Sequence, residues 1–253
     1  MQITFLGTGT SQGVPLIACS CDVCLSNDPK DKRLRTSILI EDKGKVIVID
    51  TGPDFRAQML REQVKQLDAV VFTHENKDNT VGFDDIRAFN FISKRKIDVY
   101  ASASVQEAIK REYAYIFSDF KYPGIPEINL FLLRNELTVI HGIELLPIEV
   151  LHYKLPVFGF RTGDFTYITD ANYISDVEKE KIKGSKIIVL NALRREPHIS
   201  HFTFEEALNL IEELKPEKAY LIHISHQLGL HAEVTKELPT GVELAYDGLK
   251  ITI

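Results

Sequence analysis

The sequence predicts an α/β fold in which two sets of strands pack together with helices outside them. Two observations carry this prediction. Short β-branched runs at residues 2–7, 37–41 and 45–50 are typical of strands. Further along the chain, strand-like runs alternate with helix-like segments, and such alternation favours sheets covered by helices. The length of 253 residues, with 44% hydrophobic and 26% charged residues, is enough for one domain spanning residues 1–253.

The first half begins with strands and then alternates. Residues 53–64 have helical spacing and a proline near the start, which is typical of a helix N-terminus. A serine opens the helix expected at 104–117. The other elements expected here are strands at 69–74 and 97–102 and a helix at 84–92.

The second half begins with a block of β segments and ends in renewed alternation. The β segments expected are 128–133, 137–140, 143–153 and 157–170. A strand at 186–192, a helix at 202–215, a strand at 218–225, a helix at 231–238 and a β segment at 242–253 follow. Several polar residues fall just after these strands, where α/β proteins tend to place ligands: Asp50, His74, His152, Asp170 and His223.

Charge and hydropathy exclude some classes of protein. The net charge of −6 argues against general nucleic-acid binding. No apolar run approaches the ~20 residues of a membrane span, and the N-terminus lacks the features of a signal peptide. We therefore expect a cytoplasmic protein.

Three cysteines are an odd number and all lie between residues 19 and 24, which argues against a disulfide framework.

The cysteine segment 19-CSCDVC-24 is the first candidate metal site. Thiols spaced C-x-C-x-x-C can face one ion, and zinc prefers four thiolate or imidazole ligands. The fourth ligand would come from elsewhere in the chain. The alternatives are three free cysteines in a loop, or a redox pair.

The turn 74-HENKDN-79 is the second candidate. His74 ends a predicted strand, and His74 and Asp78 could approach one point on a tight turn. The alternative is a helix N-terminus in which Asp78 stabilises the first turn. Asp50, His152, Asp170 and His223 are each explained singly as turn or hydrogen-bonded residues. Their recurrence after strands is what favours metal binding.

Together these residues resemble the metallo-β-lactamase fold superfamily. That superfamily carries a strand-end Asp, an H-x-H-x-D-H turn, a later His, a bridging Asp and a last His. The corresponding positions are Asp50, residues 74–79, His152, Asp170 and His223. The resemblance covers essentially the whole chain and implies a four-layer αββα sandwich with two metals, Zn or Mn, in a groove between the sheets.

Within that superfamily the chain looks most like the phosphodiesterases that open phosphoribosyl cyclic phosphate. That branch carries a cysteine insertion, here at about residues 17–30, completed by a histidine three residues after the last active-site His. Cys19, Cys21, Cys24 and His226 match this pattern and would hold a structural zinc ion. The relative that makes pyrroloquinoline quinone has a similar cluster, so a second branch stays open.

The resemblance also assigns roles. The first metal would use His74, position 76, His152 and Asp170, and the second would use Asp78, position 79, Asp170 and His223. His201 would assist the leaving group, with His198 as a competitor, and Asp50 would orient the histidine-rich turn by hydrogen bonds. Local phosphate contacts could come from arginines, the candidates being Arg33, Arg35, Arg87, Arg194 and Arg195.

The chain departs from the pattern at two positions, where Asn76 and Asn79 stand in place of histidine. A neutral amide oxygen suits harder ions and is a poor zinc ligand. We therefore expect impaired metal binding, as in an engineered inactive form, a natural pseudoenzyme, or an enzyme that uses one metal or a harder metal.

Three functional hypotheses follow. The first is a metal-dependent phosphodiesterase of a small cyclic phosphate or nucleotide-like ester. The second is a catalytically weak module that binds a phosphate-bearing ligand or partner. The third is another hydrolase of the superfamily, such as a thioesterase, lactamase or tRNA-processing nuclease. Homodimerisation is expected from the resemblance alone.

Overall fold

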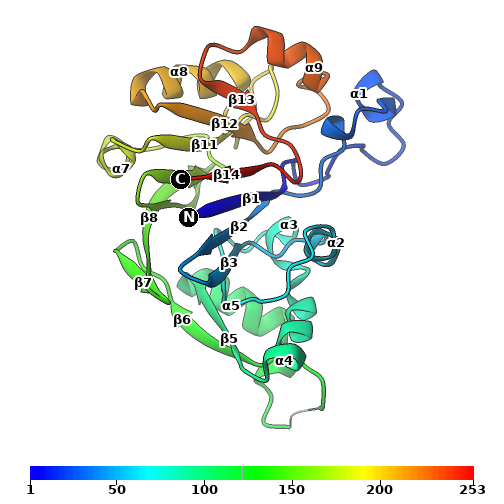
Figure 1. Ribbon diagram of the computed structural model, residues 1–253, viewed down its shortest axis with the longest axis vertical. Helices are drawn as coiled ribbons and strands as arrows, with labels where there is room; N and C mark the ends of the chain where they lie inside the picture. The colour runs from blue at the N-terminus through cyan, green and yellow to red at the C-terminus, as the bar shows by residue number, and fades with distance from the viewer. Residues whose placement is uncertain (121) are drawn as a thin grey trace.

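The computed structural model describes residues 1–120 and 122–253, which form two mixed sheets (Figure 1). The first sheet has the order β14-β1-β2-β3-β4-β5-β6. It is antiparallel from β14 to β3 and parallel from β3 to β6. Its strands are β1 (Gln2–Gly7), β2 (Ser37–Asp42), β3 (Lys45–Ile49), β4 (Ala69–Val71), β5 (Ile97–Ala101), β6 (Ile128–Leu132) and β14 (Lys250–Thr252).

The second sheet has the order β13-β12-β11-β10-β9-β8-β7. It is antiparallel from β7 to β10 and parallel from β10 to β13. Its strands are β7 (Thr138–Ile140), β8 (Ile143–His152), β9 (Leu155–Thr162), β10 (Phe165–Ile168), β11 (Ile187–Asn191), β12 (Lys218–Ile222) and β13 (Val242–Leu244).

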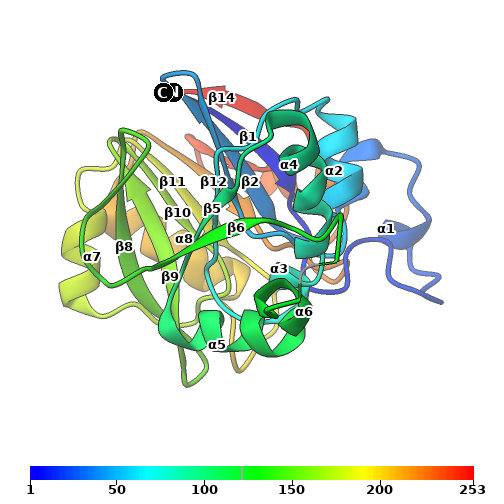
Figure 2. The ribbon, with the colours of Figure 1, turned by 90° about the horizontal axis from the view of Figure 1, so that it is seen from below.

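Helices cover the outer faces of both sheets (Figures 1 and 2). The α-helices are α1 (Asp22–Leu25), α2 (Phe55–Arg61), α3 (Lys77–Thr80), α4 (Arg87–Ser93), α5 (Ala103–Glu112), α6 (Ala114–Phe117), α7 (Asp176–Ile182), α8 (Phe204–Leu214) and α9 (His231–Val234). Three short 3₁₀ segments are η1 (Pro29–Asp31), η2 (Phe83–Ile86) and η3 (Thr235–Glu237).

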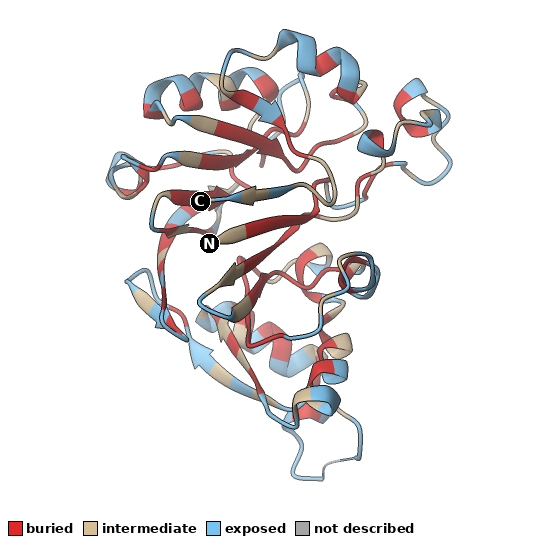
Figure 3. Ribbon diagram, in the orientation of Figure 1, coloured by how far each residue is buried: buried red, intermediate tan, exposed pale blue. Residues whose placement is uncertain are grey.

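Three apolar clusters separate four layers. The central cluster lies between the sheets and joins Phe5 of β1 to Tyr220 of β12, whose ring centroids are 5.5 Å apart. A second cluster lies beneath the helices over the first sheet, and a third lies between the second sheet and α8. Figure 3 shows the same buried strands between partly exposed helices. This arrangement confirms the predicted αββα sandwich.

Several predicted elements differ in detail. The helix expected at 84–92 is a 3₁₀ turn followed by α4, and the helix expected at 104–117 is broken at Tyr113, whose φ is −114°. The cap of α5 is Ser102, two residues before the expected start, and its hydroxyl accepts from the Val105 N–H. The final β segment divides, so that β13 joins the second sheet while β14 pairs with β1 in the first.

The cysteine segment, including α1, stands away from the body in both ribbon views (Figures 1 and 2). Within the described residues, no helix has the length and apolar character needed to cross a bilayer.

Candidate metal centre

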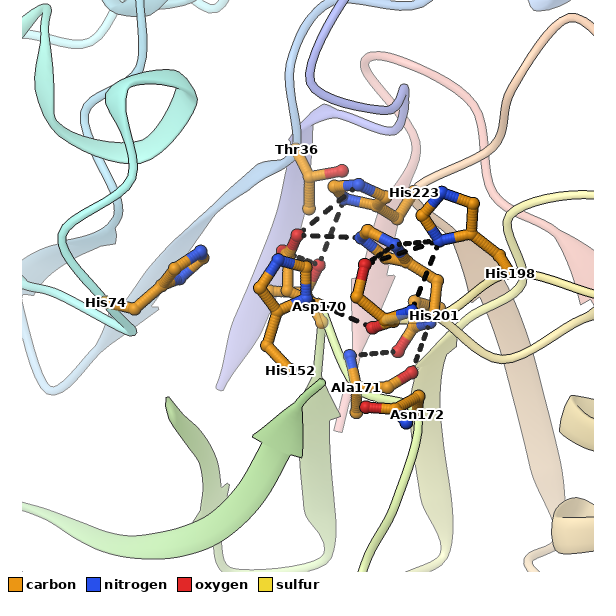
Figure 4. Close-up of polar contacts among 12 residues, drawn as sticks. Thr36, His74, His152, Asp170, Ala171, Asn172, His198, His201 and His223 are labelled. Carbon is orange, nitrogen blue, oxygen red and sulfur yellow. Dashed lines mark hydrogen bonds and ion pairs between the residues drawn. The ribbon is translucent and has the colours of Figure 1, made fainter. Parts of the chain in front are cut away.

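Histidines from both sheets lie around Asp170, near the ends of several strands (Figure 4). Asp50 directly follows β3, and His74 lies three residues after β4 in the first sheet. From the second sheet, His152 ends β8, Asp170 follows β10 and His223 directly follows β12. The strand-end residues singled out from the sequence therefore meet across the two sheets.

Three of these residues have left-handed backbones. The φ values are 65° at Asp50, 54° at Asp170 and 55° at His223. This region is uncommon for residues other than glycine and tends to persist where the surroundings enforce it. Each turn ends a strand abruptly, so a polar side chain follows directly on a buried apolar run.

Asp50 forms hydrogen bonds with the turn that contains His74. Its carboxylate accepts from the Thr73 N–H at 2.9 Å, the Thr73 hydroxyl at 2.8 Å and the Asn79 amide at 2.9 Å. The Thr73 hydroxyl in turn lies 2.9 Å from Nδ1 of His74. Asp50 therefore contacts both ends of the turn, and its expected role in orienting the turn stays a prediction.

A glycine permits this close packing. A Cβ at Gly52 would lie 2.0 Å from the carbonyl oxygen of Asp78, so only glycine fits where the loop after β3 meets α3. The Thr51 N–H donates to the Asn79 carbonyl at 2.7 Å in the same contact.

Asp170 lies at the centre of two overlapping ligand groups. Potential ligand atoms of His74, His152 and Asp170 all lie within 4.8 Å of one another, and so do those of Asp170, His201 and His223. Oδ1 of Asp170 is 3.2 Å from Nε2 of His201 and 3.4 Å from Nε2 of His223. Two ions sharing one carboxylate would fit this arrangement.

Unpartnered buried atoms support that fit. Nε2 of His74, Nε2 of His223 and Oδ1 of Asn79 are buried and form no hydrogen bond within the described part of the chain. Buried polar atoms normally have partners, so such orphans call for an explanation. Imidazole nitrogen and amide or carboxylate oxygen are all metal donors, and a divalent cation would satisfy these atoms together.

Burial and neighbouring groups also set the protonation states of the candidate metal ligands. Burial lowers the pKa of His74 to about 4 and that of His223 to about 3, so both imidazoles are neutral at physiological pH. Burial alone would raise the pKa of Asp170, but His223, His201 and His74 hold it well below its usual value. Neutral imidazoles and an ionised carboxylate are the protonation states that bind metal.

Among the described residues, neither ligand group includes Asp78, although the charge of Asp170 acts on it. Burial, and then the charge of Asp170, raise the pKa of Asp78 to about 6. Two carboxylates close enough to oppose each other's ionisation favour a cation between them. Asn76 is the half-buried N-cap of α3, and its carbonyl accepts from the Asn79 N–H at 3.0 Å.

His201 and His198 come from the loop before α8. Nδ1 of His201 is 3.1 Å from Nδ1 of His198, and both rings lie beside the Ser200 hydroxyl. Nδ1 of His152 is 3.1 Å from the carbonyl oxygen of Ser200, so it carries the proton and leaves Nε2 free as a donor to metal. The leaving-group role expected of His201 stays a prediction.

The cysteine segment forms a separate cluster. Ligand atoms of Cys19, Cys21, Cys24 and His226 all lie within 4.8 Å of one another. Nδ1 of His226 is 3.5 Å from Sγ of Cys19 and 3.3 Å from Sγ of Cys21. The His226 contact is the main cause that lowers the pKa of Cys21 to about 6, whereas burial raises that of Cys24 to about 11. The structure thus brings the four expected ligands together.

Sequence reasoning missed Thr73 and Ser200. Thr73 links Asp50 to His74, and Ser200 links His152, His198 and His201 through its carbonyl and hydroxyl. A hydroxyl residue next to a candidate histidine was the available signal, because imidazole ligands commonly hydrogen-bond through their second nitrogen.

The arginines have different surroundings. Arg33 is buried and bonds to Thr8, the carbonyl of Ala245 and His231, so it is structural. Arg35 is partly exposed and near enough to Asp78 to lower the pKa of that carboxyl. The charge of Arg194 acts on His198 in the same way, and its guanidinium donates to the Pro197 carbonyl.

Comparison with known proteins defines the class. The domain family described as "Beta-lactamase superfamily domain" matches residues 45–224. The chain therefore belongs to the β-lactamase superfamily, and its fold is the metallo-β-lactamase fold.

Several solved structures are similar to this chain. A crystal structure described as a new diphosphatase from the PhnP family is 38% identical, with a TM-score of 0.94 over 100% of this chain and 97% of that one. Zn²⁺-bound PqqB from Methylobacterium extorquens is 16% identical, with a TM-score of 0.80 over 100% of both chains. Human tRNase Z, short form, is 17% identical, with a TM-score of 0.72 over 100% and 99%. The last two show a shared fold alone.

A curated relative from Porphyromonas gingivalis, named octanoyltransferase, is 38% identical over 100% of this chain. The match takes in 52% of that protein, so the chain spans about half the length of the curated relative.

Proposed function

We propose that the protein is a metal-dependent hydrolase of small phosphoesters, either a phosphodiesterase or a diphosphatase. The observation that carries this proposal is the pair of ligand groups that share Asp170, together with the buried Nε2 atoms of His74 and His223, which form no hydrogen bond among the described residues. The 38% identical relative is named a diphosphatase, which favours attack at phosphorus over thioester or lactam hydrolysis.

The chain's own residues prepare the site for two Zn or Mn ions. His74, His152 and Asp170 would hold one ion, and Asp78, Asn79, Asp170 and His223 would contribute to the other. When bound, the ions would supply a nucleophilic water near neutral pH and neutralise charge on phosphate oxygens. Asp50 fixes the turn carrying His74 and Asn79, so these donors are held in place before metal arrives.

The same residues suggest how substrate would be held. Arg35 is ion-paired to Asp54 at 3.1 Å, and its side chain is 30% exposed, so it can contact a phosphate oxygen at the rim. His198 and His152 are partly exposed, and the more buried His74, Asp170 and His223 lie behind them. We infer that the substrate enters from the His198 side.

The cysteine cluster would hold a structural zinc ion through three thiolates and His226, a ligand set typical of closed tetrahedral sites. His226 lies three residues after His223, so zinc there would brace the loop that presents His223.

The test is hydrolysis by the metal-loaded protein. Substrates are a chromogenic phosphodiester, a ribosyl cyclic phosphate and a nucleoside diphosphate, each assayed with Zn²⁺ and with Mn²⁺. Asp170→Asn should lower turnover by more than about 100-fold, because loss of outer-shell partners alone costs about 10–100-fold. The matched control is Asp164→Asn, at an exposed carboxylate paired with Lys186, which should leave turnover unchanged. No turnover by the natural chain or by Asn76→His/Asn79→His would refute the hydrolase proposal.

Asn76 and Asn79 favour a second candidate function. Amide donors weaken zinc sites, so the groove could bind a phosphate-bearing ligand without hydrolysing it. In that case calorimetry would detect ligand binding to a chain that turns over none of these substrates, and the double Asn→His variant would gain hydrolysis.

A further inference from the structure

We propose that His201 is itself a metal ligand, and that it supplies the second ion with the nitrogen donor that residue 79 lacks. This inference rests on the proposed function, since it requires metal at the centre. It adds a ligand from the loop before α8, outside the histidine turn.

The position of His201 is the first argument. Its ligand atom lies in one group with those of Asp170 and His223, all within 4.8 Å. Its ring stacks on that of His223, with centroids 4.7 Å apart and an interplanar angle of 18°. The Nε2 atoms of both rings approach the same oxygen of Asp170, at 3.2 and 3.4 Å (Figure 4). An ion at Asp170 and His223 would therefore be within reach of His201.

The state of Asn79 is the second argument. Its Nδ2 donates to Asp50 at 2.9 Å, so only the buried Oδ1, which forms no hydrogen bond among the described residues, is left to bind an ion. An amide oxygen is a weak ligand for zinc and gives no nitrogen donor. Residue 79 therefore offers the second ion no imidazole, whereas the buried imidazole of His201 lies 3.2 Å from Asp170.

The contact between His198 and His201 is the third argument. Nδ1 of His201 lies 3.1 Å from Nδ1 of His198, so one proton is shared between them. The Ser200 hydroxyl lies 3.3 Å from Nδ1 of His198 and 3.1 Å from Nδ1 of His201, so the two rings share one polar contact region. If Nδ1–H of His201 donates to His198, then Nε2 of His201 carries the lone pair toward Asp170, as a ligating imidazole requires. His198 is then a positioning residue.

A ligand role and a leaving-group role predict different measurements. A histidine that only protonates the leaving group affects turnover and leaves metal content unchanged. A ligand changes the number or affinity of bound ions in the absence of substrate.

The experiment titrates apo protein with Co²⁺ in three matched variants, His201→Gln, His198→Gln and His141→Gln. His141 pairs with Asp98 away from the centre and serves as the control. Thiolate-to-cobalt charge-transfer bands report the cysteine cluster, and Co²⁺ that binds without further gain in those bands is assigned to the histidine sites. Circular dichroism confirms that each variant is folded.

We expect two Co²⁺ per chain at the histidine sites in the natural protein and in His141→Gln. His198→Gln should bind the second ion about 10-fold more weakly, and His201→Gln more than about 100-fold more weakly, because its ligand is lost rather than an outer partner. Two ions bound with unchanged affinity in His201→Gln would overturn the inference while leaving the proposed function intact. A natural protein that binds Co²⁺ only at the cysteines would overturn the proposed function and this inference together.

Discussion

Asp50→Ala is expected to destabilise the metal-free protein strongly, because the carboxylate is fully buried and accepts three hydrogen bonds. Burial raises its pKa to about 7, so near neutral pH it is only partly ionised and each bond is of ordinary rather than charge-assisted strength. At about 1–1.5 kcal/mol per bond, the loss is about 3–5 kcal/mol. That is a large share of the about 5–15 kcal/mol that stabilises a typical domain.

The measurement is urea unfolding of the metal-free chain, followed by circular dichroism at fixed pH. Asp164→Ala is the control, because this carboxylate is exposed and its loss should leave the transition midpoint where it is. Asp50→Ala should also weaken metal binding by about 10–100-fold, because it frees the turn that carries His74. A loss below about 1 kcal/mol with unchanged metal affinity would refute the reasoning that Asp50 holds this turn.

Other predictions concern Arg33, Thr203, Asp78 and Cys24. Arg33→Met should lower stability by about 3–5 kcal/mol in thermal unfolding, because the guanidinium is buried and its partners, including His231, would be left unpaired. Thr203→Ala should cost about 1 kcal/mol, since it removes the capping box of α8. Metal affinity should fall by up to about tenfold per pH unit below pH 6 and stay level above it, because protons compete for Asp78, whose pKa is about 6. Calorimetry at pH 5, 6 and 7 checks this, and an affinity that is flat across the range would exclude Asp78 as a ligand. Cys24→Ser should release the zinc of the cysteine cluster, seen as one fewer zinc per chain by elemental analysis.

The strands were predictable from sequence because their faces are buried. The runs at 2–7, 37–41 and 45–50 match β1, β2 and β3 to within a residue, since β-branched residues fill the cores on both sides of the first sheet. Helices were predicted less well. Spacing alone does not show that Tyr113 interrupts the segment 104–117, because its ring packs on Phe83 and its hydroxyl donates to the Thr80 carbonyl.

The candidate site was predictable where a polar residue follows a buried strand, as with Asp170 and His223. The burial of these side chains was not predictable, because it depends on how the two sheets face each other. The sequence order also places His201 thirty-one residues from Asp170, so their 3.2 Å contact follows from the loop before α8 and not from spacing. The division of residues 242–253 between the two sheets was not predicted either, because both pieces have the same local strand pattern.

The most direct test of the account is the number and position of bound divalent cations. Crystals grown with Mn²⁺ and Zn²⁺ and measured by anomalous scattering would locate each ion. We predict one ion among His74, His152 and Asp170, a second among Asp170, His201 and His223, and a zinc ion at the cysteine cluster. Occupancy of the cysteine cluster alone at saturating metal would contradict the account, because the buried histidine nitrogens would then have no ion to bind.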